Sequence, residues 1–89
     1  SELDIHDIDN NLLELVNSMK PFGKDNHPPV FLLKNVDYYF ENDVPYIEKE
    51  GKRLKVDKVV ENPPPSRKVD VYLKVNGDYL EVIKWDWRE

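Results

Sequence analysis

The sequence contains no cysteine. This absence excludes disulfide bonds, thiolate metal sites and cysteine nucleophiles, and it is typical of proteins in a reducing compartment. No apolar run approaches the roughly 18 residues that a membrane helix requires, and the first residues are acidic, whereas a signal peptide begins with basic ones. We therefore expect a cytoplasmic, intracellular protein that is not embedded in a membrane.

Side chains that carry catalysis or bind metals are also scarce. The two histidines, His6 and His27, have no ligand-type neighbours at the spacing of a metal site. The three serines have no base beside them in sequence, and no phosphate-binding loop or hydrolase motif is present. We expect a protein without enzymatic activity, without a metal and without a cofactor.

The length and charge of the chain favour one small domain over residues 1–89, with enough apolar residues (39%) for a modest core. The net charge is −5, but it is unevenly distributed. Residues 1–45 hold nine acids against three lysines, while residues 46–89 hold nine acids against ten lysines and arginines. This asymmetry argues against a general polyanion binder and permits a local basic face.

The N-terminal region predicts an amphipathic helix over about residues 5–19. Asp4 is suited to the N-cap position, Asp7 lies three residues later as in a capping box, and Pro21 and Gly23 end the helix. Apolar residues recur at the three- and four-residue steps of one helix face. They are Ile5, Ile8, Leu12, Leu15, Val16 and Met19.

The rest of the chain predicts short β-strands, so we expect an α+β fold in which the helix packs on an antiparallel sheet of four to six strands. The expected strands cover about residues 30–40, 44–49, 53–60, 69–75 and 79–87. A Pro-rich segment, residues 62–66, is predicted to be an extended connection within the domain.

An internal similarity indicates that much of the sheet consists of two β-hairpins, over about residues 44–60 and 69–87. Residues 46–58 align without gaps on residues 72–84, and each segment has an X-Gly pair typical of a tight turn, Glu50-Gly51 and Asn76-Gly77. A turn at Asn76-Gly77 would place Leu73 opposite Leu80 on an apolar face. The similarity has two explanations, duplication or convergence on a common hairpin composition.

The C-terminal tryptophans, Trp85 and Trp87, alternate along the last strand and so can share one side. They either complete the core or form an interface with a partner or a second copy of the chain. Our leading hypothesis is a non-enzymatic protein-binding module, regulatory or accessory, that binds a protein partner or a second copy of itself through a sheet edge or through Trp85, Trp87, Tyr72 and Tyr79.

A second hypothesis, from another class, is a small β-barrel-like domain that binds single-stranded nucleic acid. Such proteins combine cationic grooves with aromatic side chains on which bases stack, and an OB-like or SH3-like barrel would present a suitable sheet. Acidic residues interleave with the lysines, however, which is also typical of an ordinary solvated hairpin. The residues predicted for this alternative site are Lys52, Arg53, Lys55, Tyr72 and Tyr79.

Overall fold

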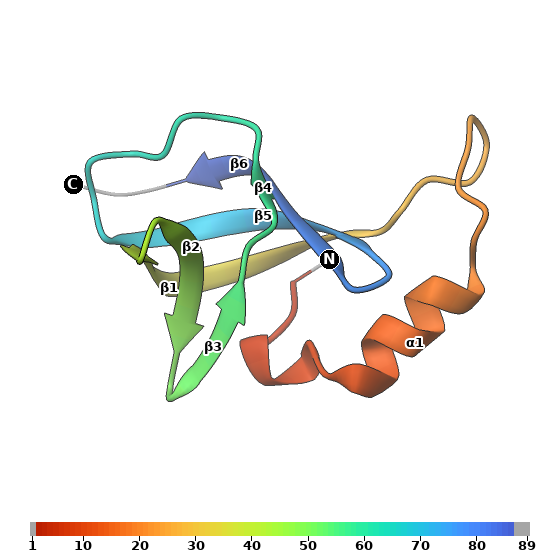
Figure 1. Cartoon of the computed structure of the whole chain (residues 1–89), viewed down its shortest axis with the longest axis horizontal. Helices are drawn as coiled ribbons and strands as arrows, with labels where there is room; N and C mark the ends of the chain where they lie inside the picture. Colours follow the sequence, from red (N-terminus) through yellow and green to blue (C-terminus); the bar gives the residue numbers. More distant parts are fainter. Residues whose placement is uncertain (1, 87–89) are drawn as a thin grey trace.

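The computed structural model describes residues 2–86 and confirms the α+β class, with a helix preceding a six-stranded, mostly antiparallel sheet (Figure 1). A 3₁₀ turn covers Ile5–Asp7 and helix α1 covers Asn10–Ser18. The strands are β1 (Val30–Glu41), β2 (Val44–Lys49), β3 (Lys52–Lys55), β4 (Lys58–Val59), β5 (Lys68–Asn76) and β6 (Tyr79–Asp86). The predicted connection at residues 62–66 contains no helix or strand.

The prediction of one continuous helix over residues 5–19 was wrong, because two aspartates each cap a separate segment. The capping box of Asp4 and Asp7 is present, but it closes only the 3₁₀ turn, and the backbone leaves helical angles at Ile8 (φ −83°, ψ 78°). Asp9 then caps α1 by accepting a 3.0 Å hydrogen bond from the Leu12 N–H group.

The helix also buries less of its apolar face than its periodicity predicts. Val16 is buried and Leu12 packs against the core, but Leu15 is 61% exposed and Met19 is 43% exposed. Only part of the apolar face of α1 therefore packs against the core.

The strand order closes the sheet into a barrel. The order is β3-β2-β1-β5-β6-β4, so β3 and β4 lie at opposite edges although only Val56 and Asp57 separate them in the chain. The Val56 N–H donates to Pro45 O on β2 (2.9 Å), and the Asp57 N–H donates to Leu80 O on β6 (2.8 Å). The two residues thus connect the β3 edge of the sheet to the β4 edge. The prediction of a single strand over residues 53–60 was wrong, because the chain pairs with β2 before Val56 and with β6 after Asp57.

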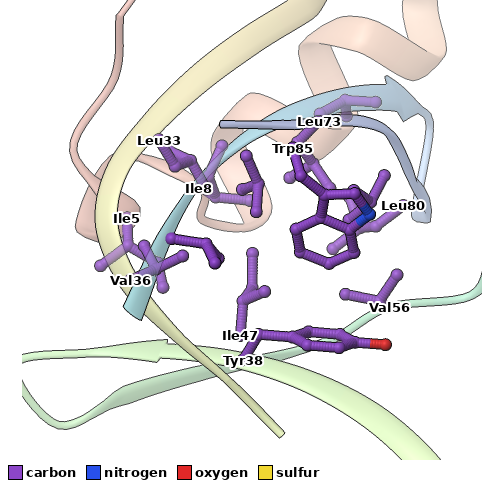
Figure 2. Close-up of a cluster of buried hydrophobic side chains, with 14 of the residues drawn as sticks. Ile5, Ile8, Leu33, Val36, Tyr38, Ile47, Val56, Leu73, Leu80 and Trp85 are labelled. Carbon is purple, nitrogen blue, oxygen red and sulfur yellow. The ribbon is translucent and has the colours of Figure 1, made fainter. Parts of the chain in front are cut away.

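The core fills this barrel with alternate residues of β1, β2, β5 and β6 (Figure 2). The Trp85 side chain is only 3% exposed, and its ring lies 4.5 Å from the Tyr38 ring between centroids. Its indole N–H donates to Glu61 O at 2.9 Å. Ile5, Ile8 and Val16 bring the N-terminal region into the same cluster.

The two hairpins differ in their turns. Lys49 pairs with Lys52, so the first hairpin turns at Glu50-Gly51 as predicted, and both residues have positive φ (50° and 82°) as in a type I′ turn. In the second hairpin Asn76 pairs with Tyr79, which places the turn at Gly77-Asp78.

The register predicted for the second hairpin was therefore wrong by two residues. Leu80 lies opposite Val75, and Leu73 lies opposite Val82. The completely buried Val75 thus pairs with the apolar Leu80, whereas a turn at Asn76-Gly77 would have paired it with the charged Asp78.

Candidate functional site

Two tyrosines lie side by side on the outer face of the barrel. Tyr39 of β1 is directly opposite Tyr46 of β2, and their neighbours Tyr38 and Ile47 point into the core. Because side chains alternate along a strand, burial of Tyr38 and Ile47 directs Tyr39 and Tyr46 outward. The two rings stack with 6.0 Å between centroids and an interplanar angle of 27°.

An arginine lies over each ring of this aromatic pair. The Arg53 guanidinium lies 4.1 Å from the centroid of the Tyr46 ring, and the Arg67 guanidinium lies 5.1 Å from that of Tyr39. Arg53 comes from β3, whereas Arg67 is held beside β1 by a 2.8 Å hydrogen bond from Tyr38 N–H to Arg67 O. We call the four residues Arg53, Tyr46, Tyr39 and Arg67 the cation–aromatic stack.

Carboxylates fix part of the cation–aromatic stack. The Tyr39 hydroxyl donates to Glu48 Oε1 at 2.6 Å, and Arg53 Nη1 lies 2.6 Å from Glu41 Oε2. The hydrogen bond to Glu48 raises the pKa of Tyr39, because it stabilises the neutral phenol. The pKa of Arg53 is also raised, first by its hydrogen bond to Tyr39 and further by Glu41. Arg53 therefore stays charged and is held over Tyr46.

The predicted nucleic-acid residues fall into three places. Arg53 and Lys55 lie at the cation–aromatic stack, since Lys55 is directly opposite Tyr46. Lys52 does not belong there, because strand alternation turns it away and its Nζ donates to Ile8 O at 2.6 Å. Tyr72 and Tyr79 lie on the other hairpin.

Tyr72 has a cationic neighbour, Lys84. It is on the outer face of β5, and Lys84 Nζ lies 5.7 Å from its ring centroid. Tyr79 is 43% exposed and pairs with Asn76 beside the turn. The structure therefore separates both tyrosines from Arg53 and Lys55, which sequence reasoning had grouped with them.

Trp85 does not form an exposed patch with Trp87, because Trp85 is buried. Trp85 is in the core, so of the two alternatives for this residue the structure shows core packing. An indole enclosed by Tyr38 and the Glu61 backbone has no surface to offer to a partner. Trp87 lies outside the described residues.

Three residues of the cation–aromatic stack were missed by sequence reasoning. In Tyr38-Tyr39-Phe40, alternation requires that Tyr39 points opposite to Tyr38, so the sequence could have indicated one outward tyrosine. Tyr46 also aligned with Tyr72 in the internal similarity. Arg67 had no signal, because it follows the proline-rich connection and reaches Tyr39 only through the pairing of β1 with β5.

The other surface features of residues 2–86 give weaker indications. A surface pocket of about 340 Å³ is lined by side chains of both charges, the lysines Lys34 and Lys68 and the aspartates Asp70 and Asp86. The described part of the chain contains no group of three or more potential metal ligands. Within the same residues no helix is long and apolar enough to cross a membrane.

The strand order agrees with a known small barrel when β3 and β4 are counted as one interrupted strand. The OB-fold is a five-stranded, partly open Greek-key barrel, and five strands closed through Val56 and Asp57 satisfy that description. Searches of curated proteins and of solved structures gave no match. A family model described as RecJ OB domain matches residues 1–72, a range that contains the whole cation–aromatic stack. The chain therefore belongs to the RecJ OB domain family.

Proposed function

We propose that this domain binds single-stranded nucleic acid on the outer face of β1, β2 and β3, with the cation–aromatic stack as the central contact. OB-folds bind oligonucleotides on the face of their second and third strands. Proteins that bind single strands use aromatic rings for stacking and cations for the phosphates. The observation that carries the proposal is that two stacked tyrosines and two arginines occupy this face.

The loops indicate a short binding site. In OB-folds the loops between strands 1 and 2 and between strands 4 and 5 extend the ligand site. Here the corresponding loops, Asn42-Asp43 and Gly77-Asp78, have only two residues each. The strand face must therefore supply most of the contacts, and we expect the site to cover about four nucleotides, the low end of the range for OB-folds.

The charges indicate weak electrostatic attraction. Among the cations near the cation–aromatic stack, Arg53 is paired with Glu41 and Lys68 is paired with Asp37 at 2.8 Å. Lys55 and Arg67 form no ion pair within residues 2–86. Two phosphate contacts at about −0.7 each predict a slope of about −1.4 for log K against log salt.

The first experiment is a titration of a fluorescently labelled oligothymidylate, followed by anisotropy at low and then rising salt. Removal of base stacking costs about 1–3 kcal/mol per base, so Tyr39→Leu/Tyr46→Leu is expected to weaken binding at least tenfold. Tyr72→Leu/Tyr79→Leu is the matched control, because it removes two outward tyrosines from the other hairpin and should leave affinity nearly unchanged.

Two results would overturn the proposal. One is the absence of saturable binding by the wild-type domain at low salt. The other is an equal loss of affinity in both double variants, while circular dichroism shows that each remains folded. The earlier hypothesis of a protein partner or a homodimer stays a prediction, and it would take first place if the domain bound no oligonucleotide.

A further inference from the structure

A guanidinium lies over each tyrosine ring of the cation–aromatic stack. Tyr39 lies between Tyr46 on its β2 side and Arg67 on its β5 side, because β2 and β5 flank β1. The Arg53 guanidinium lies 4.1 Å from the Tyr46 centroid and also reaches Glu41 on β1, so it covers Tyr46 from the side of β1. A base can therefore stack on the Arg67 side of Tyr39 only if that guanidinium leaves its place.

The two arginines are held very differently. Arg53 lies on a paired strand, is 4.1 Å from its ring centroid, and is bound to Glu41 at 2.6 Å. Arg67 lies in the connection just before β5, and its guanidinium is 5.1 Å from the Tyr39 centroid. Within residues 2–86 no carboxylate or hydroxyl forms a hydrogen bond or ion pair with the Arg67 guanidinium.

We propose that Arg67 is an exchangeable cap: a base of the bound strand takes its place on Tyr39, and the released guanidinium turns to a phosphate. Arg53 stays on Tyr46, because Glu41 holds it there. The inference rests on the proposed function and adds the location of the first base subsite, on the face of Tyr39 that is turned away from Tyr46. The exchange replaces the contact of Arg67 with the Tyr39 ring by a contact of the base with that ring, and it adds a charge-assisted contact between Arg67 and a phosphate of the nucleic acid.

The most direct test follows the arginine side chains by NMR during a titration with unlabelled oligothymidylate. In the free domain the Nε–H resonances of Arg53 and Arg67 are expected to be shifted upfield by the rings beneath them. At saturation Arg67 should lose this shift, while Arg53 keeps it. If Arg67 keeps its upfield shift when the oligonucleotide is bound, cap exchange is wrong although the proposed function stands.

An abasic oligonucleotide separates the role of the base from that of the phosphate. This probe has the same sugar–phosphate chain but nothing that can stack on Tyr39. We expect it to leave the Arg67 resonance in its upfield position at concentrations where oligothymidylate displaces it. Equal displacement by both probes would overturn the exchange, because phosphate attraction alone would then remove the cap. Absence of binding by both probes would instead contradict the proposed function.

Substitutions of Arg67 give an independent readout. Arg67→Lys keeps the charge but loses the planar group, so affinity for oligothymidylate should equal or exceed that of the wild type with an unchanged salt slope. Arg67→Ala should reduce the salt slope by about 0.7, the contribution of one phosphate contact. A tenfold loss of affinity in Arg67→Lys would overturn the proposal, since it would mean that the planar cap must stay in place.

Discussion

The β2–β3 and β5–β6 hairpins have the same pattern of residues but different structural roles. In both, the tyrosine that begins the pattern points outward (Tyr46 and Tyr72), and the next residue, Ile47 or Leu73, is completely buried. The β2–β3 hairpin has its turn at Glu50-Gly51 and presents half of the cation–aromatic stack. The β5–β6 hairpin turns one residue later in the pattern and supplies much of the core.

The difference shows that the pattern determines which face a residue takes but not which residue it pairs with. Because side chains alternate with period two, a shift of two residues in the pairing keeps every apolar residue on the inner face. The pairing itself depends on neighbours distant in sequence. In the second hairpin the shift places Val75 opposite Leu80, and both are buried beside the N-terminal helix region.

The largest effect in this comparison is expected at the end of the second hairpin. Trp85→Ala removes a ring that is 97% buried, and it should lower the free energy of unfolding by about 3–5 kcal/mol. Tyr79→Ala, in the same strand but 43% exposed, is the control and should cost much less. Urea denaturation followed by circular dichroism measures both. A loss in Trp85→Ala no larger than in Tyr79→Ala would contradict the assignment of Trp85 to the core.

The second effect compares leucines at aligned positions, Leu54 and Leu80. Leu80 is 5% exposed, whereas Leu54 is only partly buried and packs at the margin of the core. Leu80→Ala should therefore cost about 2–5 kcal/mol, within the range for buried leucines, and Leu54→Ala should cost clearly less. The same denaturation experiment tests this ordering. Equal costs would show that the two hairpins are structurally equivalent after all.

The third effect compares the turn glycines, Gly51 and Gly77, which both have positive φ (82° and 64°). Alanine in this region costs roughly 1–2 kcal/mol. At Gly51 nothing lies near an added Cβ, whereas at Gly77 it would be 3.0 Å from Lys20 Nζ and 3.1 Å from Asn17 Oδ1. Gly77→Ala is therefore expected to lower the thermal midpoint more than Gly51→Ala, and the reverse order would contradict the observed turn.

The smallest effect concerns two adjacent tyrosines whose pKa values are raised for different reasons. The hydrogen bond to Glu48 raises the pKa of Tyr39, whereas burial raises the pKa of Tyr38. Both groups therefore contribute stability that is complete below the unfolded pKa of about 10 and is lost as pH rises through the folded value. Glu48→Gln should lower the pKa of Tyr39 alone, as measured by NMR titration of the ring carbons. An equal shift of Tyr38 would contradict this separation.

Local patterns predicted part of this fold. The α+β class and the first turn follow from periodicity and turn residues, which act within a few positions of the chain. Periodicity did not predict the break at Ile8, because the break depends on two aspartate caps that compete for the same segment. It also did not predict the division of β3 from β4, because that depends on pairing with strands distant in sequence. The same reason applies to the site, where Arg53 and Lys55 were predicted but Arg67 was not.

The most direct test of the proposed binding face is a map of backbone amide shifts in the isotope-labelled domain during titration with oligothymidylate. We predict that the changes gather at Tyr39, Tyr46, Arg53 and Arg67, and that the outer face of the second hairpin at Tyr72 and Lys84 shows much smaller ones. Changes centred on Tyr72 and Lys84, or no saturable change at any residue, would contradict the account.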